Sequence, residues 1–176
     1  MKQRQVEKIL EDRIDISGLA RDFLAAGFTI IKKATKLQPS GVRFIDNKDG
    51  TITDTKTGLT WVKNPHTDLP EKFKSEMKWQ LAIDACKELD FASHKDWRLP
   101  TAEELISIIN WEAGAKDNEP TIDTKFFPDT KTSYYWTITP CPWNAGYARV
   151  VGFSYGGVNG YGKGCYNYVR PVRSSQ

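Results

Sequence analysis

The stretch from Ser133 to Arg173 constrains the fold of this chain more than any other part. All seven tyrosines lie between Tyr134 and Tyr168, and seven of the thirteen glycines lie between Gly146 and Gly164. Two interpretations are open. The stretch is a glycine-rich β-hairpin region with half-buried tyrosines, or it is a recognition surface. Tyrosine offers a large amphipathic contact area, while Ser, Gly and Asn offer adaptable hydrogen bonds.

The charge of this stretch is one-sided. No Asp or Glu follows Asp129, and five basic residues remain after it, so this part carries +5; the whole chain carries +3, and the rest therefore carries −2. Cations interleaved with aromatic rings are typical of single-strand nucleic-acid binders. Five charges over some forty residues are sparse, however. We expect Arg170 and Arg173 to pair with acidic groups earlier in the chain, and we expect no nucleic-acid partner.

With 176 residues, 39% of them apolar and 27% charged, the composition is that of a soluble globular protein with one sizeable core. Cys86, Cys141 and Cys165 are an odd number without zinc-like spacing, so no disulfide framework or zinc site is indicated. We expect no membrane insertion, because no apolar run is long enough. We also expect no signal peptide, because acidic residues interrupt the N-terminal segment. The localisation stays open.

Residues 1–40 differ in character from the rest. Val6, Ile9 and Leu10 suggest a short amphipathic helix, and a second helix is predicted from Ser17. These helices either cover the core or form a docking or oligomerisation segment. We therefore expect a helical N-terminal extension over residues 1–40 and a second domain over 41–176.

The pattern from Phe44 to Thr53 predicts a hairpin that turns at Asn47-Lys48-Asp49-Gly50, and residues 57–62 continue as another strand. A calcium loop is disfavoured because Lys48 stands where an oxygen ligand is needed. Residues 75–89 predict a helix with Cys86 on its buried face. Thr101 and Glu104 predict a capping box for a second helix. His66 and His94 have no ligand partners at metal spacing, so we expect solvated histidines and no metal.

The end of the chain predicts three closing strands, over residues 133–138, 148–153 and 168–173, with a tip of outward-pointing side chains between the last two. Gly156 and Gly157 are expected to need positive φ. The residues expected to hold the fold together are Trp79, Trp97, Leu99, Trp136, Phe153 and Val169.

Several ordered motifs resemble one known family. These are FIDNKDGTITDTKTGLTWVKN, W-x-x-A-x-x-A-C-x-x-L, DWRLPTAEEL, YYWT, ARVVGF and YVRPVR, in this order between about Val42 and Arg173. The set is similar to the Lcl C-terminal-type domain, named for the C-terminal domain of bacterial collagen-like adhesins. The resemblance implies an α+β, C-type lectin-like fold in which two helices pack on a twisted antiparallel sheet. It does not extend to residues 1–40.

A narrower resemblance is to the variable proteins of diversity-generating retroelements, which display a mutated ligand-binding surface on a C-type lectin-like fold. In that family, adenines are randomised, mainly in AAC codons. The products include Asn, Tyr, Ser, Gly, Cys, Ala, Val and Arg, but never Trp, Lys, Glu, Gln or Met. By this rule Trp136, Trp143 and Lys163 would be constant scaffold. The variable, ligand-binding positions would be Cys141, Asn144, Ala145, Gly146, Tyr147, Arg149, Ser154, Tyr155, Asn159, Gly160, Tyr161, Gly162, Gly164, Cys165, Tyr166 and Asn167.

These resemblances imply a non-catalytic, hypervariable display protein that recognises an unknown protein or glycan, with no cofactor, either on a virion or at a cell surface through a partner. One alternative is a conventional adhesin-type binding domain without diversification. Another is an enzyme of the formylglycine-generating type, which shares the fold superfamily and needs a specific cysteine pair. Only Cys141 and Cys165 could form that pair, and neither has the family's surrounding motif or a nearby histidine.

Overall fold

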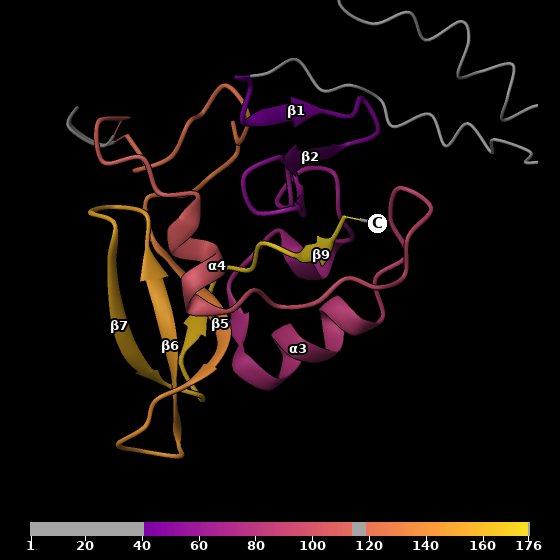
Figure 1. The fold of residues 1–176 in the computed structure, drawn as a ribbon. Helices are drawn as coiled ribbons and strands as arrows, with labels where there is room; N and C mark the ends of the chain where they lie inside the picture. Colours follow the sequence, from indigo (N-terminus) through magenta and orange to yellow (C-terminus); the bar gives the residue numbers. More distant parts are fainter. Residues whose placement is uncertain (1–40, 114–118, 176) are drawn as a thin grey trace, which may run out of the picture. The chain divides into compact units, whose positions relative to one another are not determined.

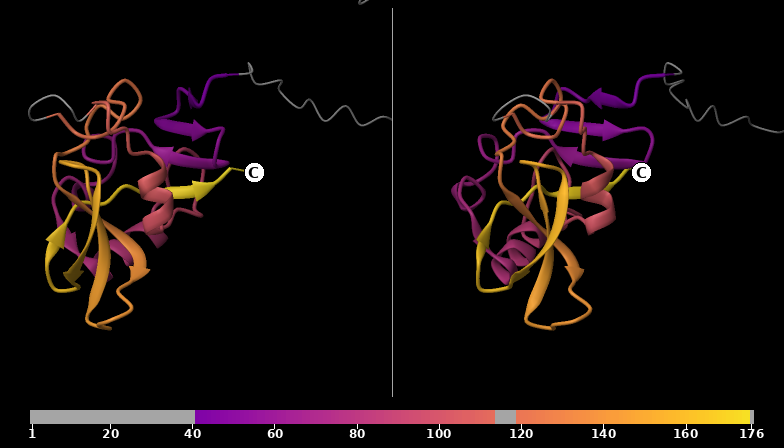
Figure 2. Two further views of the ribbon diagram at one scale, coloured as in Figure 1. Left: turned by 60° about the vertical axis from the view of Figure 1, so that its left-hand side comes forward. Right: turned by 90° about the vertical axis from the view of Figure 1, so that its left-hand side faces the viewer.

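A computed structural model of the chain describes residues 41–113 and 119–175. The expected helices of residues 1–40 lie outside this part. The described residues form a mixed α and β structure that is dominated by antiparallel sheets and contains two α-helices. Figures 1 and 2 show the sheets and the helices from three directions.

A four-stranded antiparallel sheet joins the beginning and the end of the described chain. Its strands are β1 (Phe44–Asp46), β2 (Thr51–Asp54), β3 (Leu59–Val62) and β9 (Val172–Ser174), in that order. The predicted hairpin is confirmed, since β1 pairs with β2 across the turn at 47–50. Within that turn Asp46 and Asp49 accept hydrogen bonds from the backbone N–H groups of Lys48 and Thr51. These carboxylates therefore cap the turn.

The first predicted helix begins later than expected. After the 3-10 turn η1 (Glu71–Phe73), the two residues of β4 (Met77–Lys78) pair with β8 (Tyr166–Asn167), so α3 spans only Trp79–Lys87. Cys86 is fully buried on its inner face, as predicted.

The second helix, α4 (Ala102–Ser107), begins at the predicted capping box. The amide of Glu104 donates to Thr101 Oγ1 at 3.1 Å, and the amide of Thr101 donates to Glu104 Oε2 at 2.8 Å. The two reciprocal bonds satisfy backbone donors that the first turn of a helix leaves free.

The closing strands differ from the prediction. β5 (Tyr134–Pro140), β6 (Tyr147–Gly152) and β7 (Gly157–Gly162) form a three-stranded antiparallel sheet in that order. The expected tip is therefore a strand, with its own ladder of six residue pairs to β6. The expected strand over 168–173 is not continuous, because β8 ends at Asn167, before this range, and β9 begins only at Val172. Pro171, just before β9, has no N–H for a ladder bond.

Two hydrophobic cores hold these sheets and helices together. The α3 core contains Ile83, Trp97, Trp136 and Val150, and the α4 core contains Trp61, Leu105, Tyr135 and Val151. Neighbouring residues of β5 and of β6 thus point into different cores, as the alternation of a strand requires. Figure 1 shows α4 lying against β5 and β6. The predicted burial of Trp136, Phe153 and Val169 is confirmed.

The two arginines near the end of the chain are structural, as predicted. Arg170 is fully buried and its Nη2 lies 3.4 Å from Asp129 Oδ1. Arg173 Nε lies 2.8 Å from Asp96 Oδ1. Two of the five positive charges that follow Asp129 in the sequence are therefore neutralised within the fold.

The expectation of a solvated His66 is wrong. Its Nδ1 lies 2.9 Å from the carbonyl oxygen of Phe73, and its Nε2 lies 2.9 Å from the hydroxyl of Tyr135. A carbonyl only accepts, so Nδ1 carries the proton and Nε2 accepts from the tyrosine. Burial of the ring is the main reason why the pKa of His66 is lowered.

We expect this histidine to make stability depend on pH. Because the pKa of His66 is lower in the folded state than in the unfolded state, its contribution is complete above about pH 6.5 and falls as the pH drops below that value, by up to about 1.4 kcal/mol per pH unit. Urea unfolding between pH 5.5 and 8 measures the slope. His66→Gln should flatten this dependence, whereas His94→Gln should keep it. Equal unfolding free energies at both ends of this range in the unmodified chain would contradict the prediction.

Candidate functional site

The three-stranded sheet positions the predicted site residues on both of its faces. Asn159 of β7 is paired with Val150 of β6, and Tyr161 is paired with Ala148, so these side chains share the face of the α3 core. Arg149 and Gly160 are paired on the opposite face. The predicted site residues therefore lie on both faces of the sheet around β7 and do not form a single flat surface.

A cluster of tyrosines extends from the α3 core into solvent. The rings of Tyr134 and Tyr161 are 4.8 Å apart between centroids, and Tyr134 meets Tyr155 edge to face. Asn159 Nδ2 donates to the hydroxyls of Tyr134 and Tyr155. The hydroxyls of Tyr134 and Tyr155 are 3.0 Å apart, and this hydrogen bond lowers the pKa of Tyr134 and raises that of Tyr155 to about 12. The cluster offers neutral hydroxyls and ring edges to a ligand.

The ring of Tyr155 lies against backbone that has no side chain. A Cβ atom on Gly157 would stand 2.1 Å from Tyr155 Cε2, and one on Gly152 would stand 3.2 Å from Tyr155 Cε1. Gly156, between them, has φ +73°, as expected, whereas Gly157 does not have positive φ. At Gly157 it is therefore the closeness of the ring, and not the backbone angles, that favours glycine, and a larger residue there would displace the Tyr155 ring.

On the opposite face the loop between β5 and β6 carries an exposed indole. The side chain of Trp143 is 68% exposed, and the Arg149 guanidinium lies 5.2 Å from its ring centroid. A Cβ on Gly160 would stand 3.3 Å from this ring and 2.7 Å from Cys141 Sγ. The absence of a side chain at position 160 therefore lets both groups approach β7.

A third group follows β7. Lys163 Nζ lies 4.2 Å from the ring centroid of Trp79 and donates to the carbonyl oxygen of Ala145. Lys78 Nζ lies 5.6 Å from the exposed ring of Tyr166. In the described parts of the chain Lys78, Arg149 and Lys163 have no carboxylate within ion-pair distance. Cations over aromatic rings are thus offered to solvent.

Most of the predicted site residues lie at the surface. Four are half-buried, namely Arg149, Gly160, Tyr161 and Gly162. The exposed ones are Asn144, Ala145, Gly146, Tyr147, Ser154, Tyr155, Asn159, Gly164, Cys165 and Tyr166.

Two of the predicted positions are corrected by the structure. Cys141 is 3% exposed because it closes the loop, where its amide donates to the carbonyl of Tyr147 and its sulfur lies over Gly160. Asn167 is 2% exposed because β8 pairs with β4 through Met77. Neither side chain is part of the accessible surface.

Sequence reasoning missed several residues of this surface. Trp143 was predicted to be scaffold, yet it is the most exposed large apolar side chain of the described residues. Tyr134 and Lys78 come from segments that were predicted only as strand or helix. The rule of codon reachability excluded Trp143 and Lys163 from variation. Exposure is a separate property, and no local pattern of the sequence reports it.

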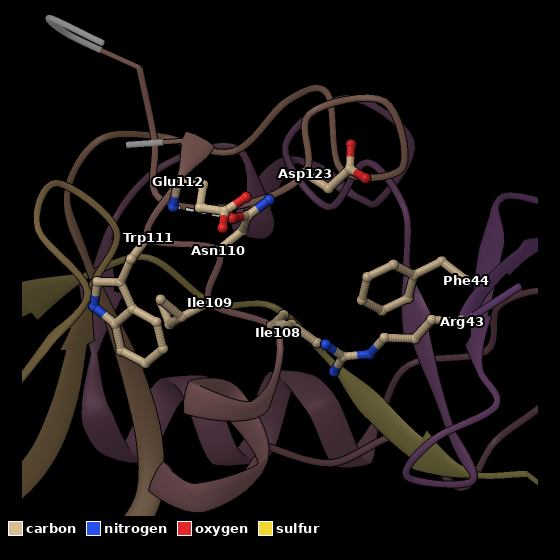
Figure 3. A pocket seen from close by; sticks show the side chains of 8 residues that line it. All are labelled: Arg43, Phe44, Ile108, Ile109, Asn110, Trp111, Glu112 and Asp123. Carbon is tan, nitrogen blue, oxygen red and sulfur yellow. Dashed lines mark hydrogen bonds between the residues drawn. The ribbon is translucent and has the colours of Figure 1, made fainter. Parts of the chain in front are cut away.

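A hollow of about 420 Å³ lies between β1 and the segment after α4 (Figure 3). Arg43 in its wall is already bound to Asp54 and to the carbonyl of Ser107, and Asn110 accepts from the amide of Glu112. The indole of Trp111, which also lines the hollow, lies close to Gly156, a residue with positive φ. Arg43 and Asn110 of this hollow therefore serve the local fold.

Among the described residues, no three His, Cys, Asp or Glu side chains gather where they could hold a metal ion. Nor does any helix in that part have the length and apolar character needed to cross a membrane.

Comparison with known proteins confirms the first of the two family resemblances that the sequence motifs indicated. The family of the Lcl C-terminal domain matches residues 50–173. This span is well over half of the chain, and the chain therefore belongs to the Lcl C-terminal domain family. The match begins in the turn between β1 and β2 and ends within β9, so it includes both helices and the three-stranded sheet. No curated protein matches the chain.

Proposed function

We propose that this protein is a non-catalytic display module with a C-type lectin-like fold, whose surface around β7 binds a protein or glycan and is diversified as in retroelement variable proteins. One observation supports this most directly. All the predicted variable positions except Cys141 and Asn167 are exposed or half-buried at or near β7. Of the three residues in the stretch from Ser133 to Arg173 that adenine mutagenesis cannot reach, Trp136 lies in the α3 core, and Trp143 and Lys163 would be constant residues of the surface.

The chemistry of the surface is consistent with recognition. Tyr, Trp and Arg are the residues that most often dominate binding energies at interfaces. The ring of Tyr155 lies against Gly157, and the ring of Trp143 lies near Gly160 and under the Arg149 guanidinium. Both rings are therefore positioned before a ligand arrives. A positioned ring loses little conformational freedom on binding.

The other functions considered have less support. Cys141 is buried and Cys165 is exposed. A cysteine-pair oxidase would need both thiols at one accessible site. Nucleic-acid binding would depend on the positive stretch, and Arg170 and Arg173 are engaged in ion pairs.

A conventional adhesin-type domain remains the alternative. The neighbouring DNA discriminates between the two: diversification requires a reverse transcriptase and a near-copy of the last coding segment that differs at adenines.

Binding can be tested at the tyrosines. A target is first selected from a display library of cell-surface proteins and glycans, and Tyr155→Ser, Tyr161→Ser and Tyr166→Ser are then compared with the unmodified chain. We expect a loss of affinity of roughly tenfold or more for at least one of them. Lys56→Ser, in the exposed turn between β2 and β3, is the matched control. Folded variants that all bind as well as the unmodified chain would refute the site.

The display proposal also predicts tolerance. Serine placed together at Tyr155, Asn159, Cys165 and Tyr166 should cost less than about 2 kcal/mol of unfolding free energy, because each side chain is exposed and such substitutions usually stay within about 0.5 kcal/mol. A thermal melt measures the effect, and a shift of a few degrees is expected. A melt lowered by tens of degrees would show that these side chains hold the fold and would overturn the display interpretation.

A further inference from the structure

Strand β7 is an unprotected edge of the three-stranded sheet. It is the last strand in the order β5-β6-β7, and none of the described segments pairs with its other side (Figure 1). Its sequence, Gly-Val-Asn-Gly-Tyr-Gly, contains no proline and no charged residue. Its ladder with β6 is regular over all six pairs. Proteins usually protect such an edge with Lys, Pro or a bulge, because it pairs readily with another strand.

The register shows which backbone groups are free. The amide of Lys163 donates to the carbonyl of Gly146, and hydrogen-bonded pairs alternate along an antiparallel ladder. Asn159 and Tyr161 therefore bond to β6, while the N–H and C=O groups of Val158 and Gly160 point outward. None of these four outward groups has a backbone partner among the described residues. Only another polypeptide backbone supplies donors and acceptors at the matching spacing.

Positive charge surrounds the end of this strand. Arg149 is the ladder partner of Gly160, and Lys163 follows β7 directly. Each cation stacks on an indole, and neither has a carboxylate within ion-pair distance in the described residues. A ligand with carboxylates would be complementary to both.

We propose that β7 binds an extended, acidic segment of a protein partner, which adds as a further strand to the sheet. The backbone of β7 would hold the segment, and Arg149 and Lys163 would select carboxylate side chains. This inference deepens the proposed display function and rests on it. A polysaccharide matches the charge but not the backbone groups. A second copy of β7 matches the backbone but brings no carboxylates.

The test begins with a displayed library of random decapeptides selected on the full chain. We expect the selected peptides to be enriched in Asp and Glu. Synthetic versions of the two best peptides are then measured by fluorescence anisotropy. Methylation of the backbone nitrogen at every second peptide residue, on the side of the peptide that faces β7, should weaken binding at least about tenfold. Each methyl group removes one hydrogen-bond donor to β7. Methylation of the other residues in the same peptide should have little effect.

Variants of the chain give an independent test. Val158→Pro removes an outward N–H without breaking a bond to β6, and it should weaken peptide binding roughly tenfold. Val158→Thr keeps the N–H and is the matched control. Lys163→Glu should lower affinity at least about tenfold and flatten its salt dependence, whereas Lys56→Glu, with the same change of net charge in the β2–β3 turn, should not.

Several results would overturn the strand-addition proposal. These are the failure to select any peptide, selected peptides without acidic enrichment, insensitivity to edge methylation, or a soluble acidic polysaccharide that competes as well as the peptides do. Concentration-dependent dimerisation that is abolished by Val158→Pro and blocks the peptides would assign the edge to a second copy instead. None of these results touches the proposed function, which the Tyr155, Tyr161 and Tyr166 variants test with a different target.

Discussion

Replacing Arg170 with methionine should lower the unfolding free energy by about 3–5 kcal/mol, the range found when one partner of a buried ion pair is removed. Arg170 Nη1 donates to the carbonyls of Val62 and Lys63 at 2.8 and 2.9 Å, and Nη2 donates to Thr130 Oγ1 at 2.7 Å. The variant would leave these acceptors without the guanidinium donor, and the carboxylate of Asp129 would keep only the hydrogen bond from the backbone N–H of His66. Urea denaturation at pH 7.5 measures the loss.

Three comparison variants separate the causes. Arg170→Lys keeps the charge but lacks the planar fork, so it should recover only part of the loss. Asp129→Asn added to Arg170→Met should cost less than the two single effects summed, because the unpaired charge is removed. Arg173→Met should cost less than Arg170→Met, since its partner Asp96 is about half exposed. An Arg170→Met chain as stable as the unmodified one would refute the structural role.

Trp136→Ala should cost a similar amount, roughly 3–5 kcal/mol, because it leaves a large cavity at the centre of the α3 core. Trp136 is fully buried, and its Nε1 donates to the carbonyl of Met77 at 2.7 Å. This bond ties β5 to β4 across the core. The same denaturation experiment measures the effect, and a loss of the near-ultraviolet circular dichroism signal would accompany it.

Trp143→Ala is the matched control, since it deletes the same side chain from the surface. With 68% of that side chain exposed, we expect a cost of about 0.5 kcal/mol or less. Trp136→Phe fills most of the cavity and should fall between the two. A Trp136→Ala variant no less stable than Trp143→Ala would contradict the assignment of one indole to the core and the other to the surface.

Local signals in the sequence were sufficient for some elements and not for others. The hairpin at Asn47–Gly50 and the capping box at Thr101 depend on residues a few positions apart, and both are confirmed. The start of α3 could not be predicted, because Met77 and Lys78 are taken by β8 from the far end of the chain. The same long-range pairing buries Asn167.

The candidate site shows the same limit. Composition indicated a surface rich in Tyr and Gly, but whether a given side chain faces water depends on register and on the loop above it. Cys141 and Cys165 were both predicted to be variable surface positions, yet one is buried and the other is exposed. His66 was misjudged because its partners, Phe73 and Tyr135, meet only in the folded chain.

The contact at Gly160 has a consequence for how such a surface could evolve. Any Cβ at position 160 would stand 2.7 Å from the sulfur of Cys141. Under the proposed diversification both codons would be free to change, yet the two side chains compete for one space beside β7. Sequences drawn independently at the two sites would be filtered by folding, so that a larger residue at 160 survives only with a smaller one at 141. The number of sequences that fold would then be smaller than the product of the residue choices at the two positions. The residues found at 141 and at 160 would also covary from one diversified sequence to the next.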